Sequence, residues 1–427
     1  MRPFEGGTAA LYDRVALRLM PILFASYIVA YLDRVNVGFA KLQMLADLRI
    51  SDAAYGLGSG IFFIGYFLFE VPSNLVLSRV GARRWIARIL ITWGVISAAT
   101  ALVRTPVEFY CVRFALGVAE AGFFPGMILY LTLWFPSWRR AKMVAVLMAG
   151  NPVSGIIGGP LSGGIMRWLG GAWHIAGWQW LFVIEALPAI LLGGVVWLFL
   201  QDRIADATWL SAPEKAQLAS ALAAESRTKT TMALRSVIGS GRVWLCCAIL
   251  FGIVMGSYAI GFWQPTIIRQ TGVRNPFTIG LLTTLPYSLA LVCMIATGHH
   301  ADRTRERRWH VAAPVLLAAT GFVLCTQAGA STTLAMAGLV LAVIGVVTAL
   351  PMFWALPTSF LGGTAAAAGI ALINCTGNLA GFVSPTIIGY LRTQTGTLGS
   401  GLVLVAACLV ASALLILFAV PARLVDR

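Results

Sequence analysis

The sequence predicts an all-α membrane protein of twelve transmembrane helices, arranged as two six-helix bundles related by pseudo-symmetry. Hydrophobic residues make up 59% of the chain, charged residues 11%, and the mean hydropathy is +0.84. These values exceed what the core of a soluble domain needs. A spanning helix takes roughly 20 apolar residues, and twelve such stretches occur. They begin near Leu17, Tyr55, Trp85, Val107, Lys142, Gly177, Val243, Pro276, His310, Thr333, Thr364 and Gly399.

The first apolar stretch is expected to stay in the protein as a membrane helix. It follows a charged lead with Asp13, Arg14 and Arg18, lacks a small-residue cleavage signature and is too long for a signal-peptide core. With the N-terminus inside, most of the 31 Lys and Arg residues fall in cytoplasmic segments, as the positive-inside rule requires. We therefore expect both termini in the cytoplasm of a bacterial cell, with the chain in the inner membrane. The net charge of +15 then reflects topology, so nucleic acid is not an expected partner.

Charge divides the chain into three parts. Residues 1–200 hold the first six apolar stretches, residues 201–242 are polar with alternating charge, and residues 243–427 hold the other six. We expect an N-terminal bundle, a cytoplasmic linker and a C-terminal bundle. The two bundles are nearly equal in length, as expected of a duplicated six-helix unit.

Two internal echoes favour duplication. The segment Asn74–Trp85 after the second stretch matches Gly298–Trp309 after the eighth, with Arg79 aligned to Arg303 at a spacing of 224 residues. The triplets Arg83-Arg84-Trp85 and Arg307-Arg308-Trp309 coincide at the same spacing. In the fifth and eleventh stretches, Gly150-Asn151 matches Gly377-Asn378 at a spacing of 227.

These loops make the chain resemble the major facilitator superfamily, whose hallmark is G-x-x-x-D-R-x-G-R-R after helix 2, repeated after helix 8. Asn74 and Ser78 replace the first glycine and the aspartate, and Arg305 replaces the second glycine of the later copy. In the family these loops latch the bundles together on the cytoplasmic side. The resemblance implies gating roles for Arg79, Arg83, Arg84, Asp302, Arg303, Arg307 and Arg308.

Four further stretches resemble the anion:cation symporter group, and its bacterial galactonate, tartrate and phthalate permeases in particular. They are Tyr66–Asn74, Gly81–Arg88, Trp180–Pro188 and Gly369–Asn374. The resemblance implies a carrier that moves organic anions together with cations.

Charged residues inside the predicted helices mark the expected site. A charged side chain near the bilayer centre costs a few kcal/mol, so it usually faces a wet cavity and marks an ion or substrate path. The first half holds Asp33, Arg34, Glu70, Arg88, Arg113, Glu120 and Glu185, and we expect none in helices 7 to 12. No histidine is expected within the membrane, because all four lie at predicted helix ends or in loops, so carboxylates must carry any proton.

Arg34 is the predicted anchor for an anion, because its planar guanidinium keeps its charge and offers two parallel donors to a carboxylate. The alternative is that Arg34 neutralises Asp33 or Glu120. The two interpretations are compatible, since an arginine released by a protonated carboxylate becomes available to a substrate.

Glu120 is expected near the middle of helix 4, within the distorted stretch Gly117–Pro125 beside a cavity. Burial favours the neutral carboxyl and a nearby arginine the charged form, so Glu120 can switch. A static contact with Arg113, seven residues earlier on the same face, is the alternative. In the resembling permeases the matching aspartate, arginine and glutamate serve coupling and binding, which implies proton coupling by Asp33 and Glu120.

Neutral polar side chains are expected to complete the substrate site. The candidates are Tyr31, Tyr66, Asn151, Asn374 and Asn378, which can hydrogen-bond hydroxyls or carboxylates; for Asn378, helix packing beside Gly377 is an equal alternative. Glu70 and Arg88, near helix ends, are interpreted as gate elements and not as ligands. Weaker candidates for the site are Tyr258, Trp263, Trp354 and Ser359.

The predicted function is proton-coupled import of a small organic carboxylate by alternating access, with a sugar acid, a hydroxy-dicarboxylate or an aromatic acid as substrate. An anion exchanger or exporter without protons is the alternative, followed by a non-transporting receptor. No nucleophile–base pair, metal cluster or phosphate loop points to an enzyme. The expected partners are the anion, protons and lipid, with no cofactor and no metal, and the protein is expected to be monomeric.

Overall fold

A computed structural model describes residues 6–226, 238–360 and 363–421. In these ranges twelve helical spans are long and apolar enough to cross a membrane, which confirms the predicted number. Their first residues lie close to the predicted starts. Residues 227–237 of the predicted linker lie outside the described residues, and its boundaries at 201 and 242 stay a prediction.

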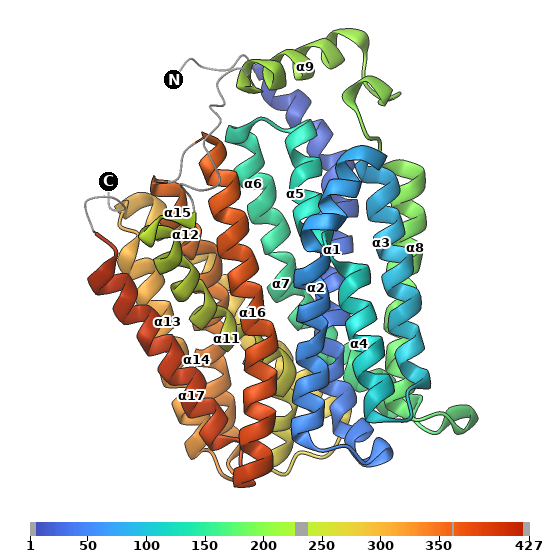
Figure 1. Ribbon diagram of the computed structural model, residues 1–427, viewed down its shortest axis with the longest axis vertical. Helices are drawn as coiled ribbons and strands as arrows, with labels where there is room; N and C mark the ends of the chain where they lie inside the picture. The colour runs from blue at the N-terminus through green and yellow to red at the C-terminus, as the bar shows by residue number, and fades with distance from the viewer. Residues whose placement is uncertain (1–5, 227–237, 361–362, 422–427) are drawn as a thin grey trace.

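The first bundle comprises helices α1 to α8 (Figure 1). Spans 4 and 5 each consist of two helices that meet at a break. The helices are α1 (Gly6–Leu48), α2 (Asp52–Val80), α3 (Ala82–Ala99), α4 (Pro106–Glu120), α5 (Phe123–Trp134), α6 (Ser137–Met148), α7 (Gly150–Trp168) and α8 (Gly177–Phe199).

The second bundle follows the short helix α9 (Ala212–Ser226). It consists of α11 (Gly241–Gln270), α12 (Pro276–Thr304), α13 (Arg308–Gln327), α14 (Thr332–Phe353), α15 (Ala355–Phe360), α16 (Gly363–Thr395) and α17 (Gly399–Leu414), the last continued by a π-turn, Leu415–Ala419. Arg14 of α1 contacts Glu214 of α9, so α9 lies at the end of the first bundle where α1 begins.

The break between α4 and α5 has a local cause. Ala121 has extended backbone angles and Gly122 has φ +82°, a conformation that only glycine adopts without strain. Pro125 follows in the first turn of α5 and lacks a backbone N–H. Glu120 is therefore the last residue of α4, next to a non-helical turn, as the predicted distortion of Gly117–Pro125 requires.

The two bundles approach each other most closely at the end opposite α9. A methyl group added at Gly56 would lie 2.3 Å from the carbonyl oxygen of Pro385, and one at Gly159 would lie 1.8 Å from Oγ1 of Thr283. Both glycines belong to the first bundle and both neighbours to the second. Small residues here let α2 pack against α16 and α7 against α12 with the backbones nearly in contact.

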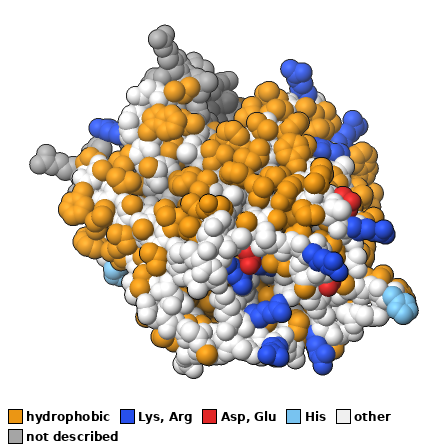
Figure 2. All heavy atoms as spheres, turned by 60° about the horizontal axis from the view of Figure 1, so that its bottom comes forward, with side chains coloured by type: hydrophobic (Ala, Val, Ile, Leu, Met, Phe, Trp, Pro, Cys, Tyr) orange, Lys and Arg blue, Asp and Glu red, His pale blue; other side chains and the backbone are white. Residues whose placement is uncertain are grey.

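The outer surface is divided as a bilayer requires. Figure 2 turns the end opposite α9 toward the viewer: hydrophobic side chains cover the flank, and charged side chains gather on the end face. Exposed residues on the flank include Leu191, Val292 and Phe418. An apolar belt with charges at its rim is the surface of a protein surrounded by lipid.

An ion cluster with a buried lysine and two partly buried partners joins the bundles at this same end, and the sequence interpretation missed it. We name Lys41, Asp52, Trp263 and Arg392 the outer cluster. Lys41 Nζ lies 2.7 Å from Asp52 Oδ1 and 3.3 Å from the centre of the Trp263 ring, and Arg392 Nη1 lies 3.1 Å from Asp52 Oδ1. Lys41 and Asp52 belong to the first bundle, Trp263 and Arg392 to the second.

Two sequence expectations are thereby corrected. The charged residues expected inside the first six helices do not include Lys41, but α1 continues to Leu48, so Lys41 is a buried helical residue. The second half was expected to hold no charge inside its helices, yet Arg392 lies in α16 and contacts Asp52. Both residues escaped notice because each lies close to a helix end, where charges are ordinary.

Replacing Asp52 by Asn should destabilise the protein strongly, because Lys41 and Arg392 would face each other without a counter-charge. Breaking a buried ion pair costs about 3–5 kcal/mol. The matched control is Asp302→Asn, which removes an exposed pair 3.8 Å from Arg307 and should cost at most about 1 kcal/mol. Melting temperatures of both variants in detergent test this, and equal values would contradict the role of the outer cluster.

Candidate functional site

A central pocket lies between the bundles and is lined from both. It encloses about 1020 Å³ of empty space, its open mouth included. All six predicted substrate-binding residues line it: Tyr31, Arg34, Tyr66, Asn151, Asn374 and Asn378. Glu120 lines it as well. The structure therefore brings together residues from α1, α2, α4, α7 and α16.

Arg34 and Glu120 form an ion pair in this pocket. Arg34 Nη2 donates to Glu120 Oε1, and the exposed fractions of the two side chains are 12% and 1%. Arg34 Nη1 donates to the hydroxyl of Tyr258 at 3.3 Å. Because Tyr258 belongs to α11, Arg34 links the carboxylate of its own bundle to the opposite bundle. In this structure Arg34 is therefore paired with Glu120, which is one of the two carboxylates considered as its partner.

Aromatic rings surround the guanidinium of Arg34. The centres of the Tyr31, Phe62, Phe63 and Tyr66 rings lie 5.4–5.9 Å from its central carbon. Ring faces attract a cation when water is excluded. Arg34 Nε is buried and has no hydrogen-bond partner among the described residues. The guanidinium is therefore held in place by its surroundings while part of its donor capacity stays unused.

Asp33, next to Arg34 in sequence, does not line the pocket. It faces the interior of the first bundle and is 1% exposed. Trp93 Nε1 donates to it at 2.8 Å, Asn36 Nδ2 at 3.3 Å, and the hydroxyl of Ser97 donates as well. Consecutive helical residues point about 100° apart, so the two charges belong to different environments, and they do not pair.

Arg113 lies fully buried in α4 without the predicted alternative contact to Glu120. All three of its guanidinium nitrogens lack a hydrogen-bond partner among the described residues. Its central carbon lies 5.0 Å from the Phe62 ring centre. Glu120, at the last turn of α4, turns toward Arg34 instead.

Glu70 contacts the second bundle directly. Asn374 Nδ2 donates to Glu70 Oε1 at 3.4 Å and Cys375 Sγ to Oε2 at 3.6 Å. It is 4% exposed. Glu70 therefore links the two bundles, and its role as a gate element stays a prediction. Arg88 lies apart from it, with its guanidinium 3.9 Å from the Trp85 ring centre.

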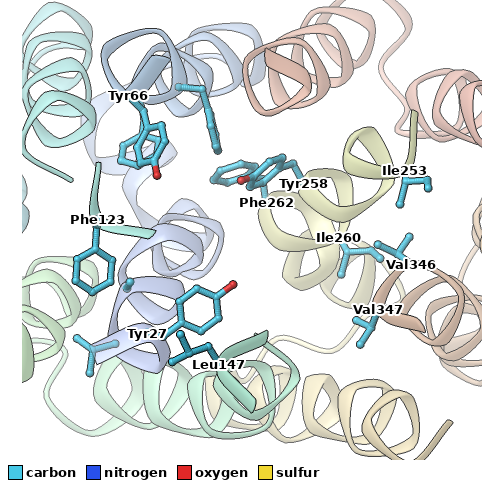
Figure 3. Close-up of a cluster of buried hydrophobic side chains, with 14 of the residues drawn as sticks. Tyr27, Tyr66, Phe123, Leu147, Ile253, Tyr258, Ile260, Phe262, Val346 and Val347 are labelled. Carbon is cyan, nitrogen blue, oxygen red and sulfur yellow. The ribbon is translucent and has the colours of Figure 1, made fainter. Parts of the chain in front are cut away.

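The pocket also contains residues that the sequence did not single out. Figure 3 shows the hydroxyl groups of Tyr27, Tyr66 and Tyr258 pointing into the space between the bundles. Tyr27 and Ser257 line the pocket but were not candidates. Tyr258 and Trp354 were weak candidates and line it, whereas Trp263 belongs to the outer cluster. Ser359, in α15, is not among the lining residues.

The predicted gating residues lie at the end that carries α9. The backbone N–H of Arg83 donates to Asp202 at 2.7 Å, and Arg83 and Arg84 border a surface hollow with Asp202. In the later loop, Arg307 lies 3.8 Å from Asp302, and Arg308 Nε donates to the carbonyl of Ile416. Arg79 and Arg303 are exposed. These contacts join each loop to segments of its own half.

Comparison with known proteins decides the family. The family model described as Major Facilitator Superfamily matches residues 23–385. The chain belongs to the Major Facilitator Superfamily. It is a multi-pass membrane protein of a transporter family, and the resemblance predicted from the Arg-rich loops is confirmed.

The relatives are similar over nearly their whole length. The chain is 47% identical to a putative metabolite transport protein, NicT, of Pseudomonas putida, covering 99% of this chain and 97% of the relative. It is 46% identical to a putative tartrate transporter of Agrobacterium vitis, covering 95% and 93%. Among solved structures, the partially occluded, inward-open xylose transporter XylE of E. coli superposes with a TM-score of 0.75 at 13% identity, covering 95% and 99%. That likeness confirms the two-bundle fold.

The Arg34–Glu120 pair can be tested by a double-mutant cycle. Arg34→Met leaves a buried carboxylate facing Tyr258 and should lower stability by about 3 kcal/mol. Glu120→Gln in the Arg34→Met background should restore part of that loss, because the unpaired charge is removed. Melting temperatures of the wild type, both single variants and the double variant measure the coupling. Additive effects would show that the two side chains do not interact.

Proposed function

We propose that this chain imports a small organic carboxylate together with protons by alternating access. The observation that supports it best is the Arg34–Glu120 pair inside a pocket lined by both bundles. A cation placed there can hold an anion, and its protein partner can be replaced by a substrate. The names of the relatives, which include a tartrate transporter and a metabolite transport protein, favour an organic acid.

Binding and proton uptake are linked through Arg34. With the pocket empty, Glu120 neutralises the guanidinium. When Glu120 takes up a proton, it stops competing for Arg34, whose two parallel donors can then hold a substrate carboxylate. Asn151, Asn374 and Asn378 and the tyrosines Tyr31 and Tyr66 bind the rest of the molecule through hydrogen bonds. The exchange of one carboxylate for another keeps the buried cation paired throughout.

Asp33 is the proposed second proton site. It lies one residue from Arg34 on the same helix, so its charge state and the position of α1 are coupled. Moving one negative charge into the cell costs about 2.3 kcal/mol per 100 mV of inside-negative potential. One proton per monoanion cancels this cost, and a second lets the potential drive uptake. Two buried carboxylates, Asp33 and Glu120, provide two protons.

The membrane orientation follows from the basic residues. The end with α9 and the two Arg-rich loops faces the cytoplasm of a bacterial cell, with both termini on that side. The outer cluster and the close glycine contacts then close the pocket toward the outside. In the opposite state the outer cluster separates. The loop residues Arg79, Arg83, Arg84, Asp302, Arg303, Arg307 and Arg308 then latch the cytoplasmic ends together.

Uptake by protein reconstituted in liposomes tests this function. A panel of labelled carboxylates should accumulate when the outside is acidic or the inside negative, and Arg34→Ala should abolish accumulation. Glu120→Gln should keep anion exchange but lose accumulation driven by the potential, because Asp33 alone then carries a proton and one proton per monoanion only cancels the charge. Glu108→Gln, which changes an exposed carboxylate in the first turn of α4, is the matched control for a carboxylate outside the pocket.

The competing functions give different results. Exchange that is indifferent to the pH gradient and to potential in the wild type, and intact in Asp33→Asn and Glu120→Gln, would replace proton symport by anion exchange. Binding of carboxylates without any flux would identify a receptor. Neither binding nor flux for any carboxylate would refute an organic-anion carrier altogether.

A further inference from the structure

We infer that the central pocket selects organic acids with one negative charge and an apolar, ring-sized body over dicarboxylates and polyhydroxy acids. The inference rests on the proposed function, because it assumes that the substrate carboxylate binds Arg34. Of sugar acids, hydroxy-dicarboxylates and aromatic acids, the pocket then fits aromatic acids best.

The charge of the pocket wall sets the charge of the substrate. Among the described lining residues, Arg34 and Glu120 are the two that carry charge at neutral pH, and they oppose each other. Once Glu120 is neutral, one positive charge remains, which one carboxylate compensates. A second carboxylate would meet no cation, and burying an unpaired charge is strongly unfavourable. Glu70, bound to Asn374 at the pocket wall, would repel it further.

The wall of the second bundle is mostly apolar. It presents Leu250, Val254, Met294, Val347, Leu350 and Trp354 to the pocket. In Figure 3, Val347 of α14 lies across the central space from Tyr27 of α1. The carboxylate end of a substrate at Arg34 lies against the first bundle, so its body extends toward these apolar side chains. Burial of apolar surface, and of ring faces against aromatic residues, favours a hydrophobic body there.

Polyhydroxy acids fit this wall poorly. Each hydroxyl taken out of water needs a hydrogen-bond partner, and aliphatic side chains supply none. The polar groups that line the pocket are the amides of Asn151, Asn374 and Asn378 and the hydroxyls of Tyr27, Tyr31, Tyr66, Ser257 and Tyr258. They can satisfy polar substituents that lie close to them, but hydroxyl groups along Leu350 and Val347 would stay unpaired on that side.

Three probes of defined charge and polarity separate these classes. Benzoate carries one charge on a ring, terephthalate adds a second carboxylate on the same ring, and gluconate carries one charge on a hydroxylated chain. Binding to the purified protein is measured by thermal shift at pH 7 and by inhibition of carboxylate counterflow in liposomes. We expect benzoate to bind at least about tenfold more tightly than either of the others, a ratio equal to ~1.4 kcal/mol. Binding of benzoate should be lost in Arg34→Ala.

A charge-gain variant makes the test specific. Met294→Lys keeps an unbranched side chain of similar length and places an ammonium group on the apolar wall. Met294→Gln is the neutral control. Terephthalate should gain about tenfold relative to benzoate in Met294→Lys and not in Met294→Gln. Trp354→Leu should weaken benzoate more than gluconate, because it removes a ring face against which an aromatic body packs.

The outcomes separate this inference from the proposed function. Tighter Arg34-dependent binding of terephthalate or gluconate than of benzoate in the wild type would overturn the inference and leave organic-anion transport standing. Equal gains in Met294→Lys and Met294→Gln would overturn the charge argument. Binding of none of the three probes would overturn the inference, and failure of the wider carboxylate panel as well would refute the proposed function.

Discussion

The structure depends on keeping one arginine paired inside a membrane. An unpaired guanidinium in an apolar environment is costly, so an anionic partner at Arg34 stabilises the protein. In this structure the partner is Glu120, held at the broken end of α4 by the Ala121–Gly122 turn. Under the proposed function, the same requirement turns a structural ion pair into an exchange site, because a substrate carboxylate that replaces Glu120 also pairs the guanidinium. Tyr258 extends the pair to the second bundle, so the occupant of Arg34 also affects how the bundles meet.

At the end of the molecule opposite α9, opposite charges hold the two bundles together. At the outer cluster, Asp52 is shared between Lys41 of its own bundle and Arg392 of the other, so separating the bundles separates opposite charges. The glycines Gly56 and Gly159 add close backbone packing across the same seam. Opening this end therefore costs free energy, which a change elsewhere in the protein has to offset. A change of partner at Arg34 can offset it under the proposed function, because Arg34 and Lys41 lie on the same helix, α1.

The sequence predicted the helices and most of the pocket because both follow from strong, local signals. Long apolar stretches give the spans, and polar residues inside them, such as Asn151 and Asn374, have few reasons to be there except a cavity. It could not predict the partner of Arg34, because Asp33 and Glu120 were both possible partners and Arg113 was an alternative partner for Glu120. It missed Lys41 and Arg392, since charges near helix ends are common and only tertiary packing buries Lys41 and brings Arg392 to Asp52. Tyr27 and Ser257 escaped because isolated tyrosine and serine residues in membrane helices carry no distinct pattern.

The central claim is that a substrate carboxylate takes the place of Glu120 on Arg34 as Glu120 gains a proton. Calorimetric titration of the purified protein with benzoate at pH 7, in buffers of different ionisation enthalpy, measures that proton directly. The account predicts uptake of about one proton per benzoate bound by the wild type and none by Glu120→Gln. Binding of benzoate to the wild type without proton uptake would contradict it.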